Sequence, residues 1–416
     1  MKERAILVTF KEGSAAAEAA DSAAELGELS GAAGLSVLQN LVFRQTRPNA
    51  AIFIGRGKAE ELRLLAQEEK ANVVVFDADL SPSQQRNLEE ALKVKTIDRT
   101  QLILDIFAQR ARSTEGKLQV ELAQLKYLLP RLSGEGIYLS RLGGGVGTRG
   151  PGEQKLEMDR RRLRERIVRL SRELAGLQKR RGLAIQKKKE KDLPMIALVG
   201  YTNAGKSTLF NRLTEAGVFV KDQLFSTLDT TTRLLPLPGN QESLLVDTVG
   251  FIRRLPHHLI ESFKATLEEA VHADILLHVM DASREDLAQI RQAVDEVLSD
   301  LGADKSKRYL VFNKIDVAED DARQALSKNS AGQPVFWVSA RTGEGLEGLL
   351  QALAAELSGG RQEMSYFIPK HRFGLLPFLH EQGQVLKRRD TADGCRLEVR
   401  LSPKDARRFE KKLNGA

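Results

Sequence analysis

Short apolar runs alternate with longer amphipathic stretches along most of the chain. In residues 1–100, strand-like runs at 5–10, 36–43, 72–76 and 94–97 are separated by helical patterns at 14–29, 58–70 and 82–92. This alternation predicts a small N-terminal α/β domain. At the other end of the chain, residues 361–416 show the pattern of a strand, a helix, two strands and a second helix, which predicts a small α+β domain.

In residues 101–192 the apolar positions recur with a different period. Two series of apolar residues step by three and four positions, the heptad spacing of a helix with one narrow apolar seam. The series are Leu118, Leu122, Leu125 and Leu129, and Leu163, Ile167, Leu170, Leu174 and Leu177. Two such seams predict an antiparallel helical hairpin arm. Its helices would span about 101–129 and 152–186, joined by a glycine-rich loop at 132–152.

Residues 193–357 contain short apolar runs, at 195–199, 243–246, 309–312 and 334–338, that each end at a polar or glycine-rich motif. The first run is followed by Gly200, Tyr201, Thr202, Asn203, Ala204, Gly205, Lys206 and Ser207. This octapeptide fits G-x-x-x-x-G-K-[ST], the phosphate-binding P-loop, and it precedes a helical run as the P-loop chemistry requires. The glycines let backbone N–H groups turn toward phosphates, Lys206 can reach the β- and γ-phosphates, and Ser207 can ligate Mg²⁺.

The motifs that end the later runs select the nucleotide. They are Asp247-Thr248-Val249-Gly250, Asn313-Lys314-Ile315-Asp316 and Ser339-Ala340-Arg341. Asp316 can accept hydrogen bonds from N1–H and the 2-amino group of guanine, and adenine lacks the second donor. Asp247 would hold a Mg²⁺-bound water, and the Gly250 N–H would sense the γ-phosphate. The sequence therefore predicts a GTP-binding P-loop domain with a mostly parallel sheet and the ligand at its carboxyl edge.

One segment between the P-loop and Asp247 is ambiguous. It begins with Phe225, Ser226, Thr227, Leu228 and Asp229. A nucleotide-responsive loop needs one threonine whose hydroxyl meets Mg²⁺ and whose N–H meets the γ-phosphate. Threonines at 227, 230, 231 and 232 compete for this role, and spacing alone does not decide between them.

Phe251 stands directly after Gly250, where many GTPases place a glutamine that orients the attacking water. Phenylalanine cannot orient water by a side-chain hydrogen bond. One interpretation is slow intrinsic hydrolysis that a partner accelerates. The other rests on Asn203, because GTPases of the potassium-activated type carry asparagine at this position of the P-loop and use it to bind K⁺ beside the phosphates.

The basic charge of the chain is concentrated in one segment. The net charge is +8, and residues 153–191 alone hold 15 Lys and Arg against 6 Asp and Glu. Arg160, Arg161 and Arg162 fall outside the apolar seam, and Arg141 and Arg149 lie in the glycine-rich loop. A charge run is often only a solvated face, but this excess favours a polyanionic partner. RNA fits better than a membrane, because the helix lacks a broad apolar face.

The cysteine count and the length of the apolar stretches bear on the cellular compartment of the chain. The chain has a single cysteine, Cys395, so it forms no intramolecular disulfide, and it contains no apolar stretch of 18 residues. We expect a cytoplasmic monomer without stable membrane association.

These motifs, with the glycine-rich segment 141–152 before the charged helix, resemble the HflX family of GTPases, relatives of the Obg group. The resemblance implies GTP and GDP as ligands and Thr227 as the threonine that meets Mg²⁺ together with Ser207. It implies catalytic roles for Lys206, Thr227 and Gly250. It also implies binding to the large ribosomal subunit and its rRNA, with the glycine-rich loop reaching toward the peptidyl-transferase region, and splitting of stalled or idle ribosomes in the GTP state.

Two alternatives stay open at this stage. The chain could be a GTP-gated clamp on RNA or the ribosome, in which hydrolysis only times release. It could also be an ATP-using RNA remodeller with a second nucleotide site in the N-terminal domain, although the sequence contains no second P-loop.

Overall fold

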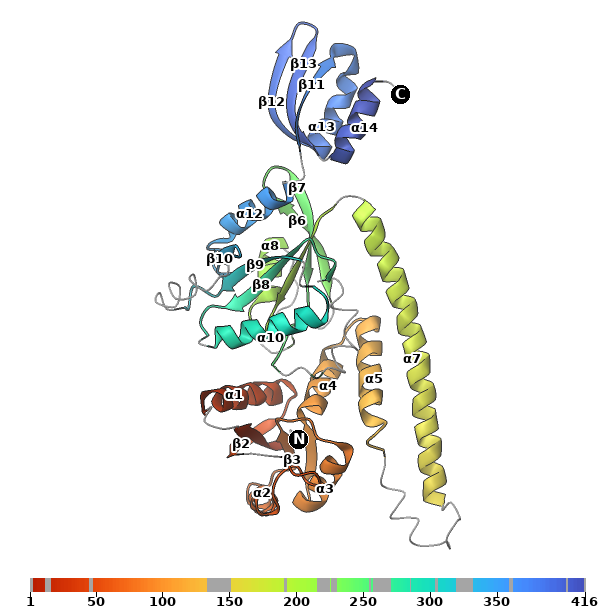
Figure 1. Ribbon diagram of the computed structural model, residues 1–416, viewed down its shortest axis with the longest axis vertical. Helices are drawn as coiled ribbons and strands as arrows, with labels where there is room; N and C mark the ends of the chain where they lie inside the picture. Colours follow the sequence, from red (N-terminus) through yellow and green to blue (C-terminus); the bar gives the residue numbers. More distant parts are fainter. Residues whose placement is uncertain are drawn as a thin grey trace.

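The computed structural model describes residues 3–11, 16–44, 48–132, 151–190, 193–214, 225, 230–253, 256, 271–284, 286–303, 306–318, 332–358, 362–401 and 403–414. Figure 1 shows three globular parts stacked along one long axis, with a long helix beside the lower two. The predicted multidomain α/β fold is confirmed.

The N-terminal domain is a four-stranded parallel sheet covered by helices on both faces. Its strands have the order β2-β1-β3-β4. The elements are β1 (Arg4–Lys11), α1 (Ala16–Ala32), β2 (Ser36–Arg44), α2 (Arg56–Glu68), β3 (Val73–Phe76), α3 (Pro82–Leu92), β4 (Lys95–Asp98) and α4 (Arg99–Arg110). Alternate strand residues point to opposite faces. Leu7 and Val75 therefore pack against α1 and α4, whereas Ile6 and Val74 pack against α2 and α3.

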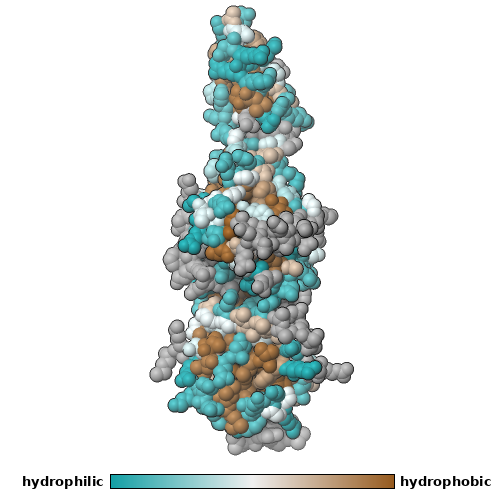
Figure 2. Space-filling model, turned by 90° about the vertical axis from the view of Figure 1, so that its left-hand side faces the viewer, coloured by the Kyte–Doolittle hydropathy of each residue, from teal (hydrophilic) through white to brown (hydrophobic). Residues whose placement is uncertain are grey.

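The N-terminal domain presents an apolar surface in one view of the molecule. Figure 2 shows apolar side chains gathered on this domain, at the bottom of the molecule. Among the described residues of this domain, the large apolar side chains that are exposed are Val37 and Val42 on the edge strand β2 and Leu64 on α2.

The predicted hairpin is present, but its first arm differs from the expectation. The stretch expected to be one helix over 101–129 is two helices, α4 and α5 (Thr114–Leu128), because Ala111 leaves the helical conformation and Ser113 caps a new helix. Helix α4 packs onto the N-terminal sheet. Only α5 lies against α7 (Pro151–Glu190), through Leu122, Leu170 and Leu174 of the predicted seams.

The middle domain is a six-stranded sheet with the order β10-β9-β8-β5-β7-β6, in which only β6 is antiparallel. Its strands are β5 (Met195–Gly200), β6 (Thr231–Leu237), β7 (Gln241–Asp247), β8 (Ile275–Asp281), β9 (Lys307–Asn313) and β10 (Val335–Trp337). Helices α8 (Lys206–Thr214) and α12 (Leu346–Ser358) cover one face, and α10 (Leu287–Asp300) covers the other. The predicted mostly parallel sheet is confirmed.

The C-terminal domain has the predicted order of elements. They are β11 (Gln362–Pro369), the 3-10 helix η1 (Lys370–Leu375), α13 (Leu376–Gln382), β12 (Gln384–Thr391), β13 (Gly394–Leu401) and α14 (Pro403–Asn414). The antiparallel sheet has the order β11-β13-β12, and Phe409 of α14 is buried against it. No helix among the described residues is long and apolar enough to cross a membrane.

Candidate functional site

The P-loop connects the carboxyl end of β5 to the start of α8 at the centre of the middle sheet. Gly205 has a φ of +89°, and an added Cβ would lie 2.2 Å from Asn313 Nδ2. Asn203 also has a positive φ, 61°, which asparagine tolerates better than most residues. The loop therefore turns back sharply on itself, with its backbone directed toward the start of α8.

Lys206 lies inside this turn. Its Nζ donates hydrogen bonds to the carbonyl oxygens of Gly200 (3.0 Å) and Tyr201 (2.7 Å). Burial lowers the pKa of Lys206 to about 8, and the carboxylate of Asp247 partly opposes this shift. The ammonium group is thus held in a poorly solvated position, where anionic oxygens are the partners that stabilise it best.

Ser207 and Asp247 bring two oxygen donors together beside the P-loop. The Ser207 hydroxyl donates to Asp247 Oδ2 at 2.6 Å, and both residues are buried. Hydroxyl and carboxylate oxygens on rigid elements, with phosphate oxygens as further ligands, are the donor set that Mg²⁺ prefers. The residues present therefore fit a nucleotide-bound Mg²⁺.

Gly250 and Phe251 lie directly on the P-loop. The Phe251 N–H donates to Gly200 O at 3.0 Å, and the Thr202 N–H donates to Phe251 O at 2.7 Å. Phe251 is 2% exposed, so its ring is part of the core. The segment after β7 thus continues as a short parallel bridge beside the end of β5.

The predicted base-binding motifs meet at the carboxyl ends of β9 and β10. Asn313 joins them to the P-loop, because its Nδ2 donates to Ala204 O at 2.9 Å and its Oδ1 accepts from the Ala340 N–H at 2.9 Å. The Ser339 hydroxyl donates to Asp316 Oδ1 at 2.7 Å. Asp316 is exposed, so its carboxylate is accessible to a ligand while Ser339 holds one of its oxygens.

Comparison with known proteins identifies the family. Four family models match in order: "GTP-binding GTPase N-terminal" over residues 20–108, "GTP-binding GTPase Middle Region" over 110–188, "50S ribosome-binding GTPase" over 195–314 and "HflX C-terminal domain" over 324–416. GTPase HflX of Caldanaerobacter subterraneus subsp. tengcongensis is 48% identical over 386 residues, 93% of this chain and 88% of that protein. The chain belongs to the HflX family of GTPases. The HflX GTPase of Escherichia coli K12 is 45% identical over 387 residues, 92% of this chain and 91% of that protein.

Among solved structures, a GTP-binding protein from the archaeon Sulfolobus solfataricus in complex with GDP is 28% identical. It matches with a TM-score of 0.44 over 85% of this chain and 98% of that chain. Membership in the HflX family establishes the chain as a GTP hydrolase with a P-loop GTPase domain.

Most residues predicted for the nucleotide site converge at one edge of the sheet. The P-loop, the Asp247–Gly250 turn and the base motifs all follow parallel strands, and parallel strands end at the same edge. Lys314 and Arg341 belong to the base motifs, and Lys314 forms an ion pair with Asp281 at 2.6 Å. Ile315 is buried, and the buried Thr248 hydroxyl donates to Leu198 O. Both residues therefore belong to the packing beneath the site.

Other predicted residues lie outside the described part of the chain or in a different place in the fold. Ser226, Thr227, Leu228 and Asp229 lie outside the described residues, as do Arg141 and Arg149. Of the competing threonines, those at 231 and 232 belong to β6, where they pair with β7. Phe225 is buried against Phe107 of the N-terminal domain, with ring centroids 4.7 Å apart.

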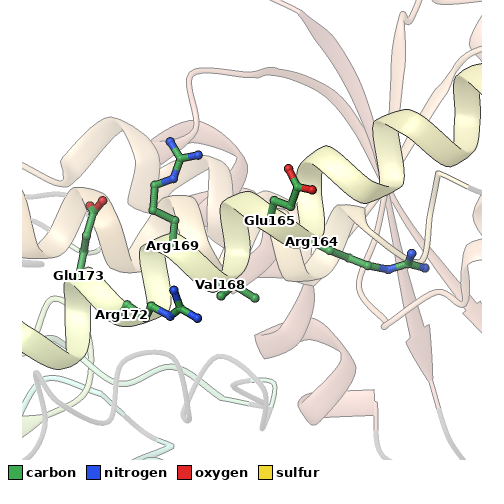
Figure 3. Close-up of a pocket in the computed structure, with 6 residues that line it drawn as sticks. All are labelled: Arg164, Glu165, Val168, Arg169, Arg172 and Glu173. Carbon is green, nitrogen blue, oxygen red and sulfur yellow. The ribbon is translucent and has the colours of Figure 1, made fainter.

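The basic helix α7 carries its arginines in two environments. Arg161 and Arg162 have side chains that are 80% and 77% exposed, whereas Arg160 is half-buried. Arg166 packs toward α5 and forms a two-point ion pair with Glu121. On the same helix, a shallow pocket is lined by side chains that Figure 3 shows extending from α7: Arg164, Glu165, Val168, Arg169, Arg172 and Glu173.

The contacts that the nucleotide site makes with the N-terminal domain could not be predicted from the sequence. The Tyr201 hydroxyl donates to Glu25 at 2.6 Å, and Arg99 donates to the carbonyl oxygen of Arg253 at 2.9 Å. Glu25 and Arg99 look like surface residues of amphipathic helices in the sequence. Both are nevertheless buried, 8% and 4% exposed, and both contact the middle domain.

Proposed function

We propose that this chain is a ribosome-associated GTPase that binds the large ribosomal subunit and splits stalled or idle ribosomes in its GTP state. The proposal rests on one observation. The same chain contains the assembled P-loop site and a helical hairpin whose long helix, α7, is strongly basic. The family description "50S ribosome-binding GTPase" for residues 195–314 agrees with it.

Within the nucleotide site, we propose that Lys206 and the P-loop amides bind the phosphates. Ser207 and Thr227 would hold Mg²⁺, which neutralises charge on the β- and γ-phosphate oxygens when it is bound. The Gly250 N–H would contact the γ-phosphoryl group. Asp316 would accept hydrogen bonds from guanine, and Asn313 would keep the base motif joined to the P-loop.

The attacking water needs help that Phe251 cannot supply. A buried phenylalanine has no group to orient water, so we propose that the intrinsic rate is slow and that the ribosome completes the site. We also propose that Asn203 contributes to a K⁺ site beside the phosphates. Its left-handed backbone, with a φ of 61°, is a conformation that asparagine tolerates better than most residues.

On the hairpin, we propose that Arg160, Arg161 and Arg162 bind rRNA phosphates, together with Arg141 and Arg149 of the glycine-rich loop. The exposure of Arg161 and Arg162 supports this role, because their only ion pairs among the described residues are with neighbouring acids on the same exposed helix. Such pairs are weak, so phosphates can replace the acids at little cost.

The test is binding of purified 50S subunits as a function of salt. Changing Arg160, Arg161 and Arg162 to Glu should weaken binding and reduce the slope of log affinity against log salt by about two to three. The matched control changes Arg56, Lys58 and Arg63 of α2 to Glu, the same charge change on a different domain. An unchanged slope in the α7 variant, or an equal loss in the α2 variant, would reject α7 as the specific RNA contact.

A further inference from the structure

The helices of the C-terminal domain cover one face of its antiparallel sheet. Figure 1 shows α13 and α14 together on one side of the three strands. Successive side chains of a strand point to opposite faces. Ile368 and Leu397 are buried against the helices, whereas Phe367 and Arg396, one residue before each of them, belong to the other face and are exposed. We call this second face the open face. It carries Glu363, Ser365, Phe367, Lys387, Arg389, Arg396, Glu398 and Arg400.

The C-terminal domain is the second strongly basic part of the chain. Residues 361–416 hold 13 Lys and Arg against 7 Asp and Glu, a net charge of +6 in a chain whose total is +8. Part of this charge lies on α14, where Arg407, Arg408 and Lys411 are exposed. A net positive charge attracts polyanions, but it does not locate the contact. The contact must be located from the way in which individual charges are paired.

Two rows of the open face pair opposite charges across neighbouring strands. Lys387 of β12 lies 3.3 Å from Glu398 of β13, and Arg400 of β13 forms an ion pair with Glu363 of β11. The first pair are direct partners in the strand register, and so are the second pair. Opposite charges in such positions stabilise a sheet. These two rows therefore have the pattern of an ordinary solvated face.

The third row of the open face departs from this pattern. In the strand register, Arg396 of the central strand lies between Arg389 of β12 and Phe367 of β11. Among the described residues, neither Arg389 nor Arg396 forms an ion pair. Like charges directly opposite each other destabilise a sheet. An anion bound by both guanidinium groups would remove this repulsion and accept hydrogen bonds from both.

Phe367 places an exposed aromatic ring at the end of the same row. Its side chain is 43% exposed. A Cβ added to Gly394 would lie 3.0 Å from Phe367 Cζ, so the tip of the ring occupies the space that a side chain at 394 would fill. Packing of an aromatic ring over a glycine stabilises a sheet. That role alone does not require two arginines without acidic partners beside the ring.

An exposed ring and two such arginines in one row fit a single-stranded nucleic acid. Bases of a single strand stack on aromatic side chains, while basic groups bind the phosphates. The bases of a duplex already stack on one another, so a duplex would leave the ring unused. An acidic peptide would use the two arginines and would also leave the ring unused.

We infer that the open face of the C-terminal domain is a binding site for single-stranded nucleic acid, in which a base stacks on Phe367 and the adjacent phosphate binds Arg396 and Arg389. The site belongs to a different domain from the basic helix α7. It requires neither GTP nor a ribosome, so the inference is independent of the proposed function.

The first test measures the affinity of the full chain for a fluorescent oligouridine of about ten nucleotides. Arg160, Arg161 and Arg162 are changed to Glu in every protein used, so that α7 contributes little. Phe367→Leu keeps an apolar side chain but removes the ring, and it should weaken binding about tenfold. Phe367→Tyr keeps the ring and should bind as the parent does. The matched control, Leu386→Ala, shortens another exposed apolar side chain of the same sheet and should have no effect.

A second pair of variants tests the arginines. Arg389→Ala combined with Arg396→Ala should weaken binding of the oligouridine. It should also reduce the slope of log affinity against log salt by about 0.7 to 1.4, because one or two phosphate contacts are lost. The matched control is Arg407→Ala combined with Arg408→Ala, which removes the same charge from α14 and should leave the slope unchanged.

Three further probes separate the possible ligands. The effect of Phe367→Leu should be confined to single strands and absent with a duplex of the same length. An oligodeoxythymidine distinguishes the two sources of a single strand, and the tighter of the two strands is the one that the site prefers. Oligouridine binding that Phe367→Leu leaves unchanged, or an equal loss with the duplex, would overturn the inference. Oligoglutamate binding that requires Arg389 and Arg396, while oligouridine binding does not, would assign the open face to an acidic protein and would also overturn it.

Discussion

At the scale of single residues, the site combines groups that are common to P-loop GTPases with two that are not. Lys206, Ser207 and Asp247 lie together as the motif spacing predicts. Phe251 occupies the position where a water-orienting side chain would be expected, and its ring is buried. Asn203 of the P-loop has a left-handed backbone. We propose that an ion or a partner supplies the chemistry that Phe251 cannot provide.

We predict that K⁺ stimulates GTP hydrolysis more than Na⁺ does, through Asn203. The measurement is the hydrolysis rate in matched KCl and NaCl at the same ionic strength. Asn203→Ala should abolish the difference between the two salts, because it removes the side-chain carbonyl oxygen that would coordinate the ion. Equal rates of the unmodified chain in both salts would reject the K⁺ site.

At the scale of elements, most of the architecture follows from local patterns. Buried runs such as β5 and β7, each followed by a glycine or polar motif, were predictable as parallel strands with the site at their carboxyl ends. The break between α4 and α5 was not predicted. The predicted seam begins only at Leu118, and the break lies before it, where Ala111 leaves the helical conformation and the Ser113 side chain caps α5.

The buried His278 of β8 leads to a prediction about how the free energy of unfolding depends on pH. It is fully buried, and burial together with nearby positive charge lowers its pKa to about 3. The unfolded chain binds a proton below about pH 6.5 that the folded chain excludes. The free energy of unfolding should therefore be fully retained above pH 6.5. Below it, this residue should contribute a loss of up to about 1.4 kcal/mol per pH unit until about pH 3.

Chemical denaturation between pH 5 and pH 8 measures this contribution. His278→Leu should flatten the acid side of the stability profile, whereas His272→Leu, at an exposed position, should leave it unchanged. If the His278 and His272 variants have the same pH profile, the buried imidazole does not determine acid stability.

At the scale of the whole molecule, the nucleotide site of the middle domain contacts the N-terminal domain. The sequence predicts the domains because each has its own pattern, and it predicts the nucleotide site because its motifs lie within one domain. It does not predict the contacts of Tyr201 with Glu25 and of Arg99 with Arg253. Tyr201 and Glu25 are 176 residues apart, and neither belongs to a motif that specifies the other. Contacts of this kind depend on how the folded domains pack against each other. The local periodicity of the sequence does not encode that packing.

We propose that the ribosome supplies the water-orienting group that this GTPase site lacks. The most direct measurement is the rate of GTP hydrolysis by the full chain alone and with purified 50S subunits, 30S subunits or bulk RNA at fixed salt, with Lys206→Ala as the inactive control. We predict strong stimulation by 50S subunits and little by 30S subunits or bulk RNA. Absence of stimulation by 50S subunits, or equal stimulation by bulk RNA, would contradict the claim.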